Sequence, residues 1–218
     1  AINLINQNNI PLVLVDREMP ECQTNFVRCD DYQGGYIAGK HLLELGHRHF
    51  LYLPGPKYNL SQTRRYAGIM DALSEANVPA SNIREIDYHT VFGSSAESTS
   101  SYKPYEELFF PVNYTAVIGF NDLQSYSAME ILQKKGYRIP EDISLISFDH
   151  LRKTHTYLPP LTSIADNSEK SIADTAVSIL LDKIRNPSSE ISSEVLPVSI
   201  FDDHTTGPIN ETFAHSFE

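Results

Sequence analysis

The chain has 218 residues, 41% of them hydrophobic and 21% charged, and 28 acidic residues outnumber 17 Lys and Arg to give a formal net charge of −11. This composition is typical of a globular protein, and the length suits one large α/β domain or two lobes of about 100 residues each. Because duplex DNA is bound mainly through Lys and Arg at its phosphates, the acidic balance excludes a DNA-binding surface made by these residues alone.

The sequence also bears on cellular location. It contains no run of about 18 apolar residues, the length that a membrane-spanning helix needs, and no secretory signal pattern opens the chain. The two cysteines, Cys22 and Cys29, make a poor disulfide framework. We therefore expect a cytoplasmic protein that makes no contact with a membrane.

Apolar strands alternate with amphipathic helices along the chain. In the first half, strands are predicted at 10–16, 26–29, 49–53 and 83–88, and helices at 1–9, 34–45 and 61–76. A polar, serine-rich stretch at 93–101 predicts a loop. In the second half, strands are predicted at 116–120, 143–148 and 195–200 and directly after the Pro-Pro turn at 159–160, and helices at 105–110, 123–135 and 168–185. The residues from 207 onward are expected to be frayed. This alternation predicts a doubly wound α/β architecture with parallel sheets.

Polar side chains stand where several predicted strands end. Asp16, Asn121 and Asp149 come at or just after the carboxyl ends of three of these strands. Arg65 lies on the helix predicted at 61–76, on the side expected to face the same region. In open α/β sheets the carboxyl ends of the strands face the ligand crevice. Carboxylates and an amide supply acceptors and a guanidinium supplies donors, so the four residues are candidates for binding a neutral polyol.

Each of these residues also has a structural interpretation, because helix capping or an ion pair between lobes uses the same groups. Asp122 is expected to cap the helix that follows it. A hydrolase with Asp16 and Asp149 as paired carboxylates is the enzymatic alternative, although the chain has no nucleophile elbow, P-loop or dinucleotide-binding motif. The histidines lack zinc-site spacing, so no metal is predicted, and His47 is expected to pack at a helix–strand corner.

Four segments of the chain form a distinctive series. They are Asp-Asp-Tyr-Gln-Gly-Gly-Tyr-Ile-Ala at 30–38 with Leu-Gly-His-Arg at 45–48, Arg-Arg-Tyr-Ala-Gly at 64–68, Phe-Asn-Asp at 120–122, and Ile-Pro-Glu-Asp-Ile-Ser-Leu-Ile-Ser-Phe-Asp at 139–149 with Pro-Pro-Leu-Thr-Ser-Ile at 159–164. In this order they resemble the effector-binding core of the LacI/GalR family of bacterial transcription regulators. The resemblance implies two Rossmann-like lobes joined by three crossovers, as in periplasmic sugar-binding proteins. It implies an incomplete N-terminal lobe, a C-terminal lobe and a short tail, at 1–29 with 165–194, at 30–164 with 195–210, and at 211–218.

The resemblance also implies a function. In the family a small polar molecule, such as a sugar, binds between the lobes, and the dimer passes the resulting movement to a helix-turn-helix domain on operator DNA. The matching ligand contacts are Asp16, Arg65, Asn121 and Asp149. Tyr88 falls near where the family places an aromatic ring, although core packing would explain it equally. We therefore expect a homodimeric effector-sensing domain, without a cofactor, whose DNA-binding domain and first strands are missing. A periplasmic sugar-binding protein of a transport system, which shares the fold, is the alternative.

The chain departs from the family's pattern at several points. Acidic residues stand at 202–203 where a basic residue is usual, residues 93–101 form an insert, and His150 replaces a frequent second aspartate. These departures concern the geometry of the cleft and leave the expected fold unchanged. Replacing Asp149 or Arg65 by alanine is expected to abolish ligand-induced thermal stabilisation and to leave the fold intact.

Overall fold

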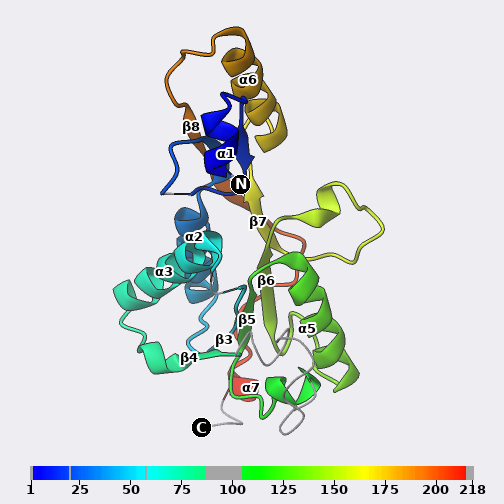
Figure 1. Ribbon diagram of the computed structural model, residues 1–218. Coiled ribbons are helices and arrows are strands. Elements are labelled where there is room, and N and C mark those ends of the chain that lie inside the picture. Colours follow the sequence, from blue (N-terminus) through cyan, green and yellow to red (C-terminus); the bar gives the residue numbers. More distant parts are fainter. Residues whose placement is uncertain (1, 20, 57, 87–104, 215–218) are drawn as a thin grey trace, which may run out of the picture. The chain divides into compact units, whose positions relative to one another are not determined.

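The computed structural model describes residues 2–19, 21–56, 58–86 and 105–214 (Figure 1). The chain divides into two compact units, each built from two separate segments of the sequence. Unit 1 comprises Ala1–Asp30 and Asp166–Ser199, and unit 2 comprises Asp31–Ala165 and Ile200–Glu218, so the chain passes between the units three times. Among the described helices, none is long and apolar enough to cross a membrane.

Unit 1 is a three-stranded parallel sheet with a helix packed on it. Its strands are β1 (Val13–Val15), β2 (Asn25–Cys29) and β8 (Ser193–Leu196), in the order β1-β2-β8. Helix α6 (Ile172–Arg185), capped by Ser171, packs Ala176 and Ile179 onto Val27 and Leu196 in a small core. The short helix α1 (Ile2–Gln7) precedes β1.

Unit 2 is a six-stranded sheet with helices on both faces. The strand order is β4-β3-β5-β6-β7-β9, and the strands are β3 (Phe50–Leu53), β4 (Ile83–Glu85), β5 (Ala116–Gly119), β6 (Ser144–Phe148), β7 (Ser163–Asp166) and β9 (Val198–Phe201). Helices α2 (Asp31–Glu44) and α3 (Leu60–Glu75) cover one face, and α5 (Asp122–Lys134) covers the other (Figure 1). Every residue of β3, β5 and β6 is buried, as expected for parallel strands covered on both faces. The predicted doubly wound architecture with parallel sheets is confirmed.

Short helical turns complete unit 2. They are η1 (Ala80–Asn82), η2 (Tyr105–Phe109), η3 (Leu151–Lys153) and the helix α7 (Glu211–Ala214). The turn η2 is a 3-10 helix at the place where the sequence predicts a helix at 105–110. The serine-rich stretch at 93–101 lies outside the described residues.

Helices α2 and α3 approach so closely that only glycine fits where they meet. A Cβ atom at Gly35 would lie 1.9 Å from the backbone oxygen of Arg65, and one at Gly68 would lie 2.1 Å from the backbone oxygen of Tyr32. Both distances are far below van der Waals contact, so a side chain at either position would push the helices apart. The contact at Gly35 holds the backbone of Arg65 next to the first turns of α2.

Two sequence predictions about the end of the chain are wrong. The strand predicted at 195–200 is two strands, because Pro197 has no N–H and separates β8 from β9, which belong to different sheets. Residues 207–214 were expected to be frayed but are ordered by hydrogen bonds to the rest of unit 2. The amide of Gly207 donates to the Ser144 hydroxyl at 3.0 Å, and that of Ile209 donates to the Leu45 carbonyl at 2.9 Å. These hydrogen bonds attach the C-terminal segment to the sheet.

His47 stands at the centre of this attachment, at the corner between α2 and β3. Its ring is 2% exposed, with Nδ1 2.8 Å from the Thr115 hydroxyl and Nε2 at 2.9 Å from the Ser144 hydroxyl and 3.1 Å from the Gly207 carbonyl. A carbonyl only accepts, so Nε2 carries the proton and Nδ1 accepts from Thr115. The predicted packing role of His47 is confirmed, and its ring joins three separate segments of unit 2.

Stability should fall in mild acid because of His47. Burial lowers the pKa of His47 from 6.5 to about 4. Between these values the unfolded chain binds a proton that the folded chain does not, so the free energy of unfolding decreases as the pH falls. We expect His47 to account for a loss of about 2 kcal/mol between pH 7 and pH 5. Urea denaturation of the wild type and of His47→Asn at both pH values tests this: the variant should be less stable at pH 7 but should lose less on acidification. Equal losses in the two proteins would contradict the assignment.

Candidate functional site

Asp149 is held in an unusual backbone conformation at the carboxyl end of β6. Its φ is 97° and that of the next residue, His150, is 49°, so two consecutive non-glycine residues lie in the left-handed region. Such conformations cost energy and cluster at functional sites. The side chain of Asp149 remains 40% exposed. The backbone therefore presents a carboxylate at the edge of the sheet where ligands bind in parallel α/β folds.

Arg65, on α3, is fixed on several sides. Its Nε donates to Asp31 Oδ1 at 2.9 Å, and Nη1 donates to the Phe120 carbonyl at 2.6 Å. The guanidinium carbon also lies 5.1 Å from the centre of the Phe120 ring and 4.5 Å from that of Phe148, within the range of cation–π interaction. The side chains of Arg65 and Asp31 are only 7% and 1% exposed. These contacts hold the guanidinium in one orientation.

The second terminal nitrogen of the Arg65 guanidinium, Nη2, points to Asp149. Arg65 Nη2 lies 3.5 Å from Asp149 Oδ1, which is long for a charge-assisted hydrogen bond. Partial burial raises the pKa of the Asp149 carboxyl above its usual value, and the nearby Arg65 guanidinium opposes this rise. A rigid donor and a partly exposed acceptor thus stand side by side with a weak bond between them. A hydroxyl-bearing ligand fits this arrangement, because each hydroxyl both donates and accepts.

Asp122 fastens the loop that follows Asp149. Its carboxylate accepts from the Leu151 amide at 2.7 Å and from the Ser163 hydroxyl at 2.8 Å, and that hydroxyl also accepts from the His150 amide at 3.0 Å. Burial raises the pKa of Asp122, while these hydrogen bonds lower it. The prediction that Asp122 caps α5 is wrong, since its side chain binds another loop and its neighbour is the capping residue.

Asn121, which follows β5, is the residue that caps α5. Its Oδ1 accepts from the Gln124 amide at 3.0 Å, so the side chain caps α5, as the structural interpretation of this residue allowed. Among the residues that the structure describes, none accepts a hydrogen bond from its amide nitrogen. Capping therefore occupies only one end of the amide, and the role of Asn121 in ligand binding stays a prediction.

The other two predicted site residues are not part of the described residues of unit 2. Asp16 belongs to unit 1, where it follows β1 with a φ of 54° and donates its amide to the Val27 carbonyl at 2.8 Å. Its pairing with Asp149 stays a prediction. Tyr88 lies outside the described residues. Unit 2 by itself brings together Arg65, Asn121 and Asp149.

Sequence reasoning missed two parts of the site. It did not identify Asp31 or the rings of Phe120 and Phe148 as parts of the site. Asp31 and Arg65 are 34 positions apart, and no local pattern links them. Gly35 and Gly68, one on each helix, are the signal that could have predicted the close approach of α2 and α3.

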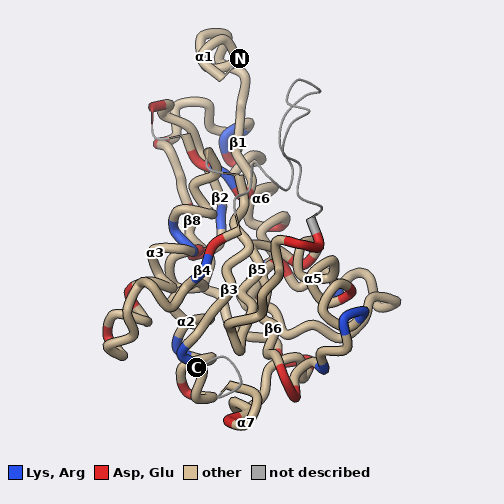
Figure 2. The backbone as a smooth tube through the Cα atoms, turned by 90° about the horizontal axis from the view of Figure 1, so that it is seen from below, with Lys and Arg blue, Asp and Glu red and all other residues tan. Residues whose placement is uncertain are grey.

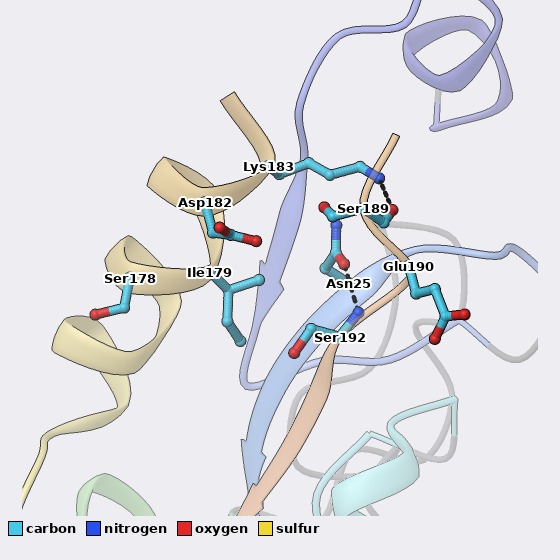
Figure 3. Close-up of a pocket in the computed structure, with 8 residues that line it drawn as sticks. All are labelled: Asn25, Ser178, Ile179, Asp182, Lys183, Ser189, Glu190 and Ser192. Carbon is cyan, nitrogen blue, oxygen red and sulfur yellow. Dashed lines mark hydrogen bonds between the residues drawn. The ribbon is translucent and has the colours of Figure 1, made fainter. Parts of the chain in front are cut away.

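A separate pocket of about 220 Å³ lies in unit 1, between the carboxyl-terminal part of α6 and the amino ends of β2 and β8 (Figure 3). Several of its polar groups already have hydrogen-bond partners. Asn25 donates to the Leu12 carbonyl at 3.0 Å and accepts from the Ser192 amide at 2.8 Å, while Lys183 donates to the Ser189 carbonyl. The pocket is at the opposite end of the sheet from Asp16, because the three strands run parallel. It is a weaker candidate for a ligand site than the edge that carries Arg65 and Asp149.

The distribution of charged residues and of potential metal ligands also bears on what the site can bind. Acidic and basic positions are interspersed in both units rather than gathered into one basic face (Figure 2). Within residues 2–19, 21–56, 58–86 and 105–214, no three His, Cys, Asp or Glu side chains are grouped so as to hold a metal ion. Arg65 and Asp149 supply a hydrogen-bond donor and an acceptor to this edge of the sheet.

The sequence and the fold can be compared with known proteins. Residues 40–206 match the model of the periplasmic binding protein-like domain family. The chain is 32% identical over 176 residues to the HTH-type transcriptional repressor PurR of Mannheimia succiniciproducens, covering 80% of this chain and 51% of that protein. It is 34% identical over 194 residues to PurR of Escherichia coli O139:H28, covering 87% and 54%. The chain thus spans about half the length of these curated relatives.

Solved structures share the fold of this chain. A LacI family transcriptional regulator from Enterococcus faecium with bound ribose superposes with a TM-score of 0.78 at 26% identity, covering 94% of this chain and 74% of that one. The CelR–cellobiose complex superposes with a TM-score of 0.75 at 24% identity, covering 93% and 61%, and shares the fold. The chain belongs to the periplasmic binding protein-like domain family and is an effector-binding core of the LacI/GalR type.

Proposed function

We propose that the chain is the effector-sensing part of a LacI-type transcriptional regulator and binds a small polar ligand, a sugar or sugar derivative, at the edge that carries Arg65, Asn121 and Asp149. The observation that carries the proposal is the rigid guanidinium of Arg65 beside the exposed, strained Asp149 at the end of β6. The ribose bound by the Enterococcus faecium relative supports a sugar as the ligand class.

The chemistry of the three side chains suits a polyol. A sugar hydroxyl can donate to the Asp149 carboxylate and accept from Arg65, and a neighbouring hydroxyl can accept from the amide nitrogen of Asn121. Hydrogen bonds that involve a charged group contribute about 1.5–3 kcal/mol each, which is enough to give a small ligand useful affinity. Asp16, from unit 1, is proposed as a further ligand contact.

Regulation requires more than this chain. We propose that ligand binding favours one arrangement of the two units, that a homodimer transmits the change, and that operator DNA is bound in the cytoplasm by a helix-turn-helix domain of the full-length protein. A ligand shifts such an equilibrium only by its difference in affinity for the two arrangements. The names of the relatives as transcriptional repressors and regulators support sensing rather than catalysis.

Two alternatives have direct tests. A periplasmic sugar-binding protein of a transport system shares the fold, and the gene upstream of this segment distinguishes it: a helix-turn-helix supports the regulator, and a secretory signal supports the transport protein. A hydrolase based on Asp16 and Asp149 would release product from a glycoside, which an activity screen detects.

The proposal itself is tested by a thermal-shift screen of the full-length protein against sugars, nucleosides and amino acids. We expect one or a few uncharged sugars to raise the melting temperature. A stabilisation of about 2.7 kcal/mol is expected when the ligand is present at a hundred times its Kd. A response confined to amino acids, or no response to any sugar, would contradict the proposed ligand class.

A further inference from the structure

We propose that Asp31 sets the charge preference of this site: by neutralising Arg65, it makes the site accept uncharged sugars and reject phosphorylated or carboxylated ones. The inference rests on the proposed function, since it concerns the ligand bound beside Arg65 and Asp149. Asp31 acts through Arg65 and is therefore a positioning residue.

The contact between the two side chains carries the argument. Asp31 Oδ1 accepts from Arg65 Nε at 2.9 Å, and with 1% and 7% exposure both side chains are shielded from water. Charges interact more strongly in such surroundings than at a solvated surface, so the carboxylate cancels most of the field of the guanidinium. An arginine meant to bind a phosphate would instead offer its forked nitrogens and an uncompensated charge.

The other charges near Arg65 point the same way. Asp149, 3.5 Å from Nη2, adds a second carboxylate to the same guanidinium, and Asp122 lies close enough for its charge to interact with that of Asp149. The cation on the following loop, Arg152, is itself paired with Asp203 at 2.9 Å. The guanidinium thus lies beside two carboxylates, those of Asp31 and Asp149, and a third, that of Asp122, lies near Asp149. An anionic ligand would meet net repulsion, whereas a hydroxyl could still use both the donor and the acceptor.

Asp31 also orients Arg65 without blocking it. It binds Nε, while the Phe120 carbonyl binds Nη1, so Nη2 is directed toward Asp149. Asparagine at position 31 would keep an acceptor oxygen and nearly the same shape but would remove the charge. The variant Asp31→Asn therefore separates the electrostatic contribution of Asp31 from its packing.

The test measures a ratio of affinities in the full-length protein by calorimetry, with D-ribose and D-ribose 5-phosphate and with D-xylulose and D-xylulose 5-phosphate as probes. The wild type should bind a free sugar more tightly than its phosphate ester. In Asp31→Asn that ratio should shift toward the ester by about tenfold or more, because one nearby negative charge is gone.

Two controls isolate the charge. Asp71→Asn removes the same charge from an exposed site on α3, where Asp71 accepts from the Tyr32 hydroxyl at 2.7 Å, and should leave the ratio unchanged. The double variant Asp31→Asn/Arg65→Gln removes both charges of the pair and should not gain affinity for the ester. A purely structural role of Asp31 would weaken both ligands alike and leave their ratio unchanged.

Several results would overturn the inference. One is a folded Asp31→Asn protein with the wild-type ratio, and another is a wild type that binds the ester as tightly as the sugar; the second measurement needs no variant and decides the question if Asp31→Asn does not fold. Binding of neither sugar nor ester by the wild type, with no sugar active in the thermal-shift screen, would contradict the proposed function and this inference with it. The wild-type measurement thus distinguishes the two failures.

Discussion

Asp149→Ala is expected to remove most of the ligand-induced stabilisation of the full-length protein while changing the melting temperature without ligand only slightly. The side chain is 40% exposed and its pair with Arg65 is long, at 3.5 Å, so little folding energy depends on it. A ligand hydroxyl, by contrast, would lose a charged acceptor, which weakens binding by about 10- to 100-fold. Thermal shift and calorimetry with the sugar found in the screen measure both effects.

The matched control is Asp182→Ala. Asp182 lines the pocket of unit 1, and its carboxylate accepts only from the Asn186 side chain among the bonds described, at 2.9 Å. This variant should respond to the ligand as the wild type does. The assignment of the site is wrong if Asp149→Ala keeps the wild-type response, and a loss of response in Asp182→Ala would move the site to unit 1.

Arg65→Ala should have a different and larger effect, because it should destabilise the fold itself by about 3–5 kcal/mol. Removing Arg65 leaves Asp31, 1% exposed, as a buried charge without its partner. The expectation from the sequence that this variant leaves the fold intact is therefore replaced. Chemical denaturation without ligand measures the loss.

An exposed ion pair provides the comparison. Arg138 bonds Asp142 at 2.6 Å, but its side chain is 63% exposed, and surface pairs of this kind contribute about 0–1 kcal/mol. Arg138→Ala should therefore cost far less than Arg65→Ala. Similar losses in the two variants would mean that the pair of Arg65 with Asp31 is no more important for folding than a surface contact.

The positions of the strand-end residues could be predicted because their causes are local. The strands that precede Asn121 and Asp149 are mostly apolar and fully buried, and the polar residue that follows each strand marks the carboxyl edge of the sheet. The close fit of α2 and α3 is also encoded locally, by glycines, although only the structure shows which backbone atoms they approach.

The errors involve partners that are distant in the sequence. Asn121 and Asp122 can both cap a helix, and the choice between them depends on Ser163, which lies 41 positions after Asp122 and binds its carboxylate. The C-terminal segment looked frayed because its hydrogen bonds to Leu45 and Ser144 cannot be read from its own polar residues. Neither pairing has a local pattern.

The buried pair of Asp31 and Arg65 is the clearest case. Asp31 is the first residue of α2 and Arg65 lies within α3. The guanidinium also donates to the Phe120 carbonyl. Sequence reasoning identified Arg65 as a candidate donor but did not identify Asp31 as its partner. In the structure Arg65 is paired and held in one orientation, which raises the expected cost of mutating it and gives a physical reason for a neutral ligand.

The most direct test is a crystal structure of the full-length protein with the sugar that gives the largest thermal shift. We predict a sugar hydroxyl within hydrogen-bond distance of both Arg65 and Asp149, with Asp31 still bound to Arg65 Nε. A sugar bound in the pocket of unit 1 beside Asn25 and Glu190, with Arg65 and Asp149 free of ligand, would contradict the account.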